Sequence, residues 1–207
     1  IAVAFYKKTM RNPKAAVTLL EKLDFSDIEK DSLTIDDYKL IFTKNDFKVK
    51  KSWFEREESI FKKYDSEKFV IIDSLKTHPD CTNRIKMIRK YSDSNFIDKT
   101  TFSDDFLRIK QSSIYQNLIN LYDQELYGIS LYETLKLYKN DIENPVLKNI
   151  IYINFSKILT SKTTFTFNRY VPKVDNKKNT ESLNRFITFV NALKSSDIEL
   201  IINNFKS

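Results

Sequence analysis

His78 and Cys81 are the side chains best suited to chemistry, and they are the only histidine and the only cysteine among 207 residues. Both lie in the stretch DSLKTHPDCTNRIKMI, residues 73–88. A phosphatase-type cysteine would need a glycine-bearing phosphate loop and an arginine farther along than Arg84, and a cysteine protease would need its histidine on a separate element. A zinc site needs three or four ligands. The stretch therefore cannot complete a catalytic or metal site by itself, and we expect Cys81 to be a buried packing residue.

The charge pattern does not favour a nucleic-acid partner. The formal net charge is +7, but 35 basic residues are interleaved with 28 acidic ones along the whole chain. The basic clusters lack the glycine and aromatic signature of an RNA-binding sheet, and solvated helical surfaces account for them equally well. These clusters are Lys48, Lys50 and Lys51, and Lys177 and Lys178. We therefore expect no nucleic acid to bind.

The scarcity of glycine excludes further function classes and favours helices. Gly128 is the only glycine, so P-loops and dinucleotide-binding loops, which need several glycines, are excluded. The chain is 41% hydrophobic and 14% aromatic, which is enough to bury a core, and its longest apolar patterns repeat at helical spacing. It contains no apolar run long enough to predict a transmembrane helix. The sequence predicts a mainly α-helical protein without a transmembrane segment.

The first half of the chain is expected to hold helices separated by irregular segments. One helix begins at Pro13, and residues 24–51, which have no sustained period, are expected to be irregular with short helical turns. Ser52 and Glu55 predict a capping box for a helix over 52–64. Pro79 is expected to begin another helix, and residues 92–110 are expected to be a linker. The apolar faces of the first and last of these helices are Ala16, Val17, Leu20 and Leu23, and Cys81, Ile85 and Ile88.

The second half, residues 111–207, reads as paired helices. Aromatic and aliphatic residues recur at spacings of three and four, Gly128 lies near a helix junction, and DIENP, residues 141–145, predicts a stop before another helix. The pattern favours a degenerate tetratricopeptide-like arrangement, in which paired helices stack on a shared face. An ordinary small helical bundle is the alternative. The last helices should bury the apolar face Leu183, Phe186, Phe189, Val190 and Leu193, before DIELIINNF closes the chain.

Two motifs resemble the C-terminal part of the M48 family of zinc metalloendopeptidases. The first is IAVAFYKKTMRNPKAAVTLLEKL, which matches a break ending in proline followed by an A-A-x-x-L-L-x-K-L helix, although MRN replaces the family's usual glycine before the break. The second is a T-H-P loop followed by an arginine and an aliphatic residue. The matching residues are Pro13, Ala15, Ala16, Leu19, Leu20, Lys22 and Leu23, and Thr77, His78, Pro79, Arg84 and Ile85.

The resemblance implies zinc as the cofactor, with its main ligands upstream of Ile1. The family's H-E-x-x-H helix has no counterpart in this chain, so no catalytic residue is assigned within it. The resemblance places His78 near the zinc cleft, as a fourth zinc ligand or a cleft residue, with Thr77, Pro79 and Arg84 as its supporting loop. The alternative is that His78 only starts the following helix. Arg84 is expected to form a structural ion pair.

By this resemblance, residues 1–91 are the helical tail of a zincin-like peptidase domain, and residues 111–207 are a tetratricopeptide-like module that binds protein. The implied function is hydrolysis of peptide bonds in envelope proteins, in the periplasm or cell envelope, and peripheral membrane association is compatible with it. A cytoplasmic location stays open. The alternative function is a non-catalytic helical adaptor or scaffold subunit of an envelope complex. Whether the catalytic half lies upstream or has been lost also stays open.

Overall fold

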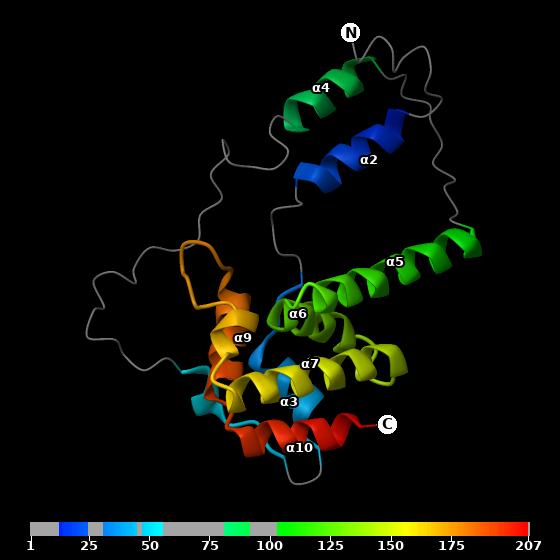
Figure 1. The fold of residues 1–207 in the computed structure, drawn as a ribbon. Coiled ribbons are helices and arrows are strands. Elements are labelled where there is room, and N and C mark those ends of the chain that lie inside the picture. The colour runs from blue at the N-terminus through cyan, green and yellow to red at the C-terminus, as the bar shows by residue number, and fades with distance from the viewer. Residues whose placement is uncertain (1–12, 25–30, 45–46, 56–80, 92–102, 207) are drawn as a thin grey trace. The chain divides into compact units, whose positions relative to one another are not determined.

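The computed structural model describes residues 13–24, 31–44, 47–55, 81–91 and 103–206 (Figure 1). Apart from one isolated bridge between Lys44 and Phe47, these residues contain no β-structure. The prediction of a mainly α-helical protein is therefore confirmed. The elements are α2 (Pro13–Asp24), α3 (Ile35–Phe42), the 3-10 helix η1 (Lys51–Phe54), α4 (Cys81–Tyr91), α5 (Asp104–Asp123), α6 (Tyr127–Tyr138), α7 (Pro145–Thr163), α8 (Phe167–Tyr170), α9 (Glu181–Ala192) and α10 (Ser195–Phe205).

The chain divides into two compact units. The first comprises residues 1–30 and 70–102 and includes α2 and α4, and the second comprises residues 31–69 and 103–207. The sequence had suggested a division into 1–91 and 111–207 with a linker over 92–110. The structure differs from that division because α3 and η1 pack in the second unit, and because α5 begins at Asp104, inside the expected linker.

Aromatic packing explains why α3 and η1 lie in the second unit. Phe189 of α9 is fully buried, and its ring centroid lies 4.9 Å from that of Tyr38, 5.5 Å from that of Phe42 and 5.3 Å from that of Phe54. Phe42 also contacts Phe155 of α7, with ring centroids 5.7 Å apart. Such pairs stabilise a core by about 0.5–1.5 kcal/mol each beyond the burial of their area. Residues far apart in sequence therefore share one core.

Polar caps determine where several helices begin. The Ser103 side chain accepts a hydrogen bond from the Phe106 amide at 3.2 Å and starts α5, whose first turn carries two aspartates. Asn144 accepts from the Val146 and Leu147 amides, both at 3.1 Å, and Pro145 is the first residue of α7. The helix stop predicted at DIENP is confirmed.

The prediction of a capping box at Ser52 is wrong. Ser52 lies inside η1, whose N-cap is Lys50 without a side-chain cap, and Glu55 follows the 3-10 helix in an extended conformation. The capping box instead occurs at α3, where Thr34 and Asp37 exchange side-chain to backbone hydrogen bonds of 2.7 and 3.2 Å. The remainder of the helix predicted over 52–64 lies outside the described residues.

α9 and its C-cap bury four of the five residues of the predicted face, and Leu183, the fifth, is partly buried. Phe186, Phe189 and Val190 are fully buried on α9, and Leu193 at its C-cap is 2% exposed. Lys162 of α7 donates to the backbone carbonyls of Asn191 and Leu193, and so it binds the carbonyls at the end of α9 that no helical amide can reach. Burial lowers the pKa of Lys162, while Asp197 acts in the opposite direction.

Gly128, the sole glycine, lies at a close approach between two backbone segments. A Cβ atom at this position would lie 3.0 Å from the Cα of Val171 and 3.2 Å from the carbonyl oxygen of Tyr170. These are backbone atoms, so no side-chain rotation can relieve the contact. The absence of a side chain at the start of α6 therefore lets the segment after α8 pack against it.

We predict that Gly128→Ala destabilises the protein despite the higher helix propensity of alanine. The strain of overpacking, about 1–3 kcal/mol, should exceed the gain of about 1 kcal/mol in propensity. Thermal unfolding followed by circular dichroism measures the effect. Ser112→Ala, at an exposed position of α5, is the control and should leave the melting temperature unchanged or slightly raised. An equal response of the two variants would contradict the account of Gly128.

Two helices end in Schellman motifs without glycine. After α7, the Thr166 amide donates to Ser161 at 2.8 Å and the Phe165 amide to Lys162 at 3.3 Å, and Phe165 has φ 58°. After α5, Glu125 takes the corresponding position with φ 61°. These are left-handed conformations that cost a side-chain-bearing residue about 1–2 kcal/mol. The chain therefore accepts backbone strain at both helix ends.

We predict that Phe165→Gly stabilises the protein by about 1 kcal/mol, because it relieves the left-handed strain. The Phe165 side chain is 96% exposed, so little packing is lost. Urea unfolding measures the change in free energy. Phe165→Ala removes the ring but keeps the strain, and it should not stabilise. A gain of the same size from alanine would show that the ring, rather than the backbone, causes the cost.

Candidate functional site

The segments that carry the peptidase resemblance pair as α2 and α4 in the first unit. An Arg89 guanidinium nitrogen lies 2.9 Å from a carboxylate oxygen of Glu21, and the Thr82 hydroxyl donates to Asp24 at 3.5 Å. Both members of the ion pair are largely exposed, so its contribution to stability is at most about 1 kcal/mol. Ile85 of α4 is buried and adds an apolar contribution.

The predicted site residues are only partly visible in the structure. Thr77, His78 and Pro79 lie outside the described residues. Arg84 lies in the helix α4 and not in a loop. Its side chain is exposed and makes no ion pair with another described residue. The ion pair to α2 is formed by Arg89. Cys81 is 1% exposed, which agrees with the expected packing role.

The described segments do not supply a zinc site. Within them, no group of three or more histidine, cysteine, aspartate or glutamate residues is placed to hold a metal ion. His78, the residue that the resemblance assigns to the metal, is outside these segments.

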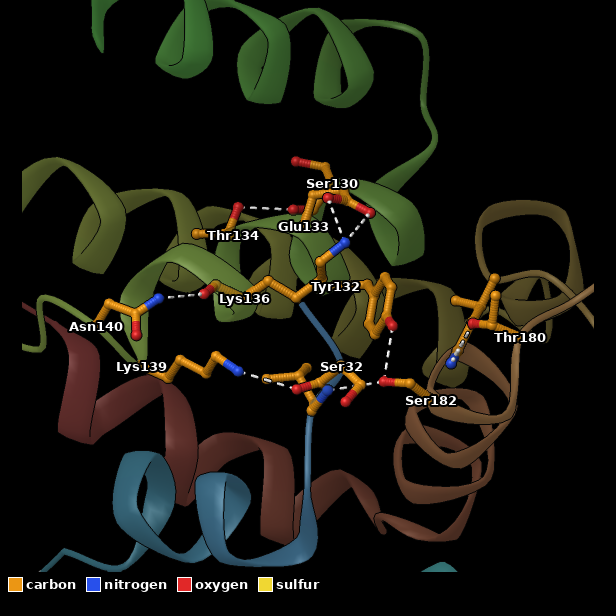
Figure 2. A network of polar contacts seen from close by, with 12 residues as sticks. Ser32, Ser130, Tyr132, Glu133, Thr134, Lys136, Lys139, Asn140, Thr180 and Ser182 are labelled. Carbon is orange, nitrogen blue, oxygen red and sulfur yellow. Dashed lines mark hydrogen bonds and ion pairs between the residues drawn. The ribbon is translucent and has the colours of Figure 1, made fainter. Parts of the chain in front are cut away.

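A polar network in the second unit fixes residues 32–33 against α6 and α9 (Figure 2). The Ser182 hydroxyl accepts hydrogen bonds from the Leu33 amide and from the Tyr132 hydroxyl, both at 2.8 Å. Lys139 donates to the Ser32 carbonyl at 2.9 Å. Arg185 donates to the Leu33 carbonyl at 2.8 Å. The backbone of this segment is thus satisfied by side chains, a role that the sequence did not signal because isolated serines and lysines carry no motif.

A second buried polar cluster links α6 to α5 and α7. The Ser130 hydroxyl donates to the Leu118 carbonyl at 3.0 Å and accepts from the Asn154 amide at 3.0 Å. Thr134 donates to the Ser130 carbonyl at 2.6 Å. Since all of these groups are buried, their hydrogen bonds restrict how the three helices can slide past one another.

Tyr138 differs from Tyr132 although both are buried in the same helix. The Tyr138 hydroxyl has no hydrogen-bond partner within the described part of the chain, whereas Tyr132 donates to Ser182. Burial raises the pKa of Tyr138 above its ordinary value, and Glu143 and Asp141 raise it further. The pair provides an internal comparison between a satisfied and an unsatisfied buried hydroxyl.

An open groove lies along α5 and α6, and we call it the α5–α6 groove. Its volume is about 610 Å³. Apolar and polar side chains from both helices line it, together with Asp31. The lining residues are Asp31, Phe106, Ile109, Lys110, Ser113, Ile114, Asn117, Leu118, Glu133, Lys136 and Leu137. The sequence analysis did not identify this surface, although the recurrence of apolar residues early in α5 could have signalled it.

Comparisons with known proteins do not assign this chain to a family. No protein-family model, curated protein or solved structure matches the chain. None of the described helices is both long and apolar enough to cross a membrane.

We predict different effects of removing the two tyrosine hydroxyls. Tyr132→Phe loses a hydrogen bond and should destabilise by about 0.5–1.5 kcal/mol, whereas Tyr138→Phe removes an unsatisfied buried group and should be neutral or stabilising. Urea unfolding at neutral pH measures both, and equal losses would contradict the assignment.

The raised pKa of Tyr138 also sets a pH dependence. Above about pH 10, the ordinary tyrosine value, the unfolded chain loses this proton while the folded protein retains it, so folding stability falls as pH rises. Tyr138→Phe should reduce this alkaline loss, as measured by unfolding between neutral pH and about pH 11.

Proposed function

We propose that this chain is the C-terminal portion of an M48-like zinc metalloendopeptidase that hydrolyses peptide bonds of envelope proteins. The observation that carries the proposal is the pairing of α2 with α4. The two segments that resemble the family lie far apart in sequence, yet Glu21 and Arg89, which are 68 residues apart, form an ion pair between them. The pairing places the A-A-x-x-L-L-x-K-L helix beside the helix that carries Arg84 and Ile85 of the second motif, and this adjacency is what supports the proposal.

In this proposal the chain supplies the wall of the cleft and not the catalytic machinery. In this proposal, the H-E-x-x-H helix and the third, glutamate ligand would be supplied by residues outside this chain. When bound there, zinc would supply an activated water for peptide hydrolysis. Within this chain, His78 would lie near the cleft. The helices α2 and α4, which precede and follow His78 in the sequence, would belong to one compact unit.

The second unit would act as a tetratricopeptide-like module that binds protein. Three successive helices, α5, α6 and α7, pack in order along the chain, and the α5–α6 groove opens on their surface. Repeats of paired helices bury their shared faces against neighbours and expose a surface for partners. Binding of an envelope protein at this unit would bring substrate or complex partners to the peptidase.

A non-catalytic adaptor of an envelope complex is the second candidate function. The α5–α6 groove favours it, because all the groove residues come from the second unit and none of them depends on a zinc site. The genomic reading frame upstream of Ile1 separates the two candidates. An H-E-x-x-H motif followed by a glutamate supports the peptidase, and a frame without it supports the adaptor.

The experiment that tests the peptidase compares the longer reading frame with the 207-residue chain. We expect the longer protein to bind stoichiometric zinc and to cleave casein, with loss of cleavage after chelation. The chain alone should bind no stoichiometric zinc and cleave nothing, because the principal ligands are missing. Zinc is measured by metal analysis of the purified proteins. Tightly bound stoichiometric zinc in the short chain would overturn this assignment of ligands.

His78→Ala in the longer protein tests whether the T-H-P loop serves the cleft. We expect a change in zinc affinity or cleavage rate with an unchanged melting temperature. Loss of an oxyanion donor would lower the rate by about two to three orders of magnitude, whereas loss of a zinc ligand that blocks the cleft would raise it. Lys86→Ala, an exposed substitution on α4, is the control. Unchanged rate and affinity with a lowered melting temperature would show a structural role.

A further inference from the structure

We propose that the α5–α6 groove binds an amphipathic helix of a partner protein. The bound helix would place apolar side chains into the groove, an acidic residue opposite Lys110 and a basic residue opposite Asp31. This inference rests on the protein-binding role proposed for the second unit, and it specifies the chemistry of the partner.

The spacing of the groove residues suits a helical ligand. On α5 the lining residues recur every three or four positions over about three turns, from Phe106 to Leu118. On α6, Glu133, Lys136 and Leu137 follow the same spacing. Side chains at these intervals form a row along one helix face, and residues of both rows line the groove. A third helix, with apolar residues at the same intervals, can lie between them.

The exposed apolar area favours a single helix over a second copy of this chain. Ile109 is 63% exposed, Phe106 46% and Ile114 37%, and these side chains carry most of the apolar surface early in α5. The surface of the groove's lining, polar and apolar together, is far smaller than the roughly 800 Å² per partner that a stable dimer interface buries. A short helix needs only a narrow apolar row, so the available surface matches it.

The charges around the groove limit the sequence of that helix. Glu133 and Lys136 neutralise one another at 3.1 Å. Lys110 and Asp31 are exposed and form no ion pair with any described residue. A ligand helix with charges of only one sign would therefore place a like charge near one of them. A helix that carries both signs in the matching register avoids this repulsion and is selected over others.

A binding measurement with a defined peptide tests this inference. The probe is a fluorescein-labelled synthetic peptide of about five helical turns, with leucine at every third or fourth position and with glutamate and lysine at the other positions. A scrambled peptide of the same composition is the ligand control. Fluorescence anisotropy is measured with the full 207-residue chain, with Ile109→Glu, and with Leu107→Glu.

Leu107 provides the matched protein control. It is 48% exposed on the same helix but does not line the groove, so both substitutions place a carboxylate at an exposed leucine or isoleucine of α5. Circular dichroism melting shows that each variant remains folded. We expect Ile109→Glu to weaken peptide binding by at least about tenfold and Leu107→Glu by less than about twofold.

Three results would overturn the inference. They are equal affinity for the scrambled peptide, equal binding by Ile109→Glu and the unaltered chain, and a concentration-dependent dimer, seen by light scattering, that Ile109→Glu abolishes. The last result would assign the groove to a second copy of the chain. Zinc binding and proteolysis are not measured in this experiment, so its failure leaves the peptidase proposal to its own test.

Discussion

Aromatic packing around Phe189 is the interaction on which the second unit depends. The α3 helix has eight residues and η1 has four, and helices this short are not stable alone in water. They persist because Tyr38, Phe42 and Phe54 surround Phe189 with ring centroids about 5 Å from its own. This cluster joins α3 and η1 to α9, which lies near the C-terminus. Loss of the cluster would release α3 and η1 together.

The polar network around Ser182 gives this apolar core a fixed register. Ser182 accepts from the Leu33 amide, and Arg185 donates to the Leu33 carbonyl. Without these partners, each backbone group would be buried without a hydrogen bond, at a cost of about 1–3 kcal/mol. Lys139 binds the neighbouring Ser32 carbonyl. Asp31, which lines the α5–α6 groove, directly precedes these anchored residues. One of the charges that would select a partner therefore neighbours this network in the chain.

The proposed activities rest on different residues of the chain. The peptidase resemblance lies on α2, on α4 and in the T-H-P stretch, and the proposed recognition surface lies on α5 and α6. The cleft role and the partner role therefore do not depend on the same side chains. A peptidase that lost its zinc helix could keep the groove, which is the physical basis of the adaptor alternative.

The sequence alone determined the helical class, the start of α7 at Asn144 and Pro145, and the buried face of α9, because caps and helical periodicity act within a few residues. It also located Gly128 near a helix junction. It could not place α3 and η1, since their positions follow from ring contacts with residues more than a hundred positions away. The α5–α6 groove likewise arises only when two helices pack, because a single helix shows which residues are apolar but not which remain exposed. Local rules therefore gave the helical class and some of the helix ends, and long-range packing decided which elements share a core and which surface is left open.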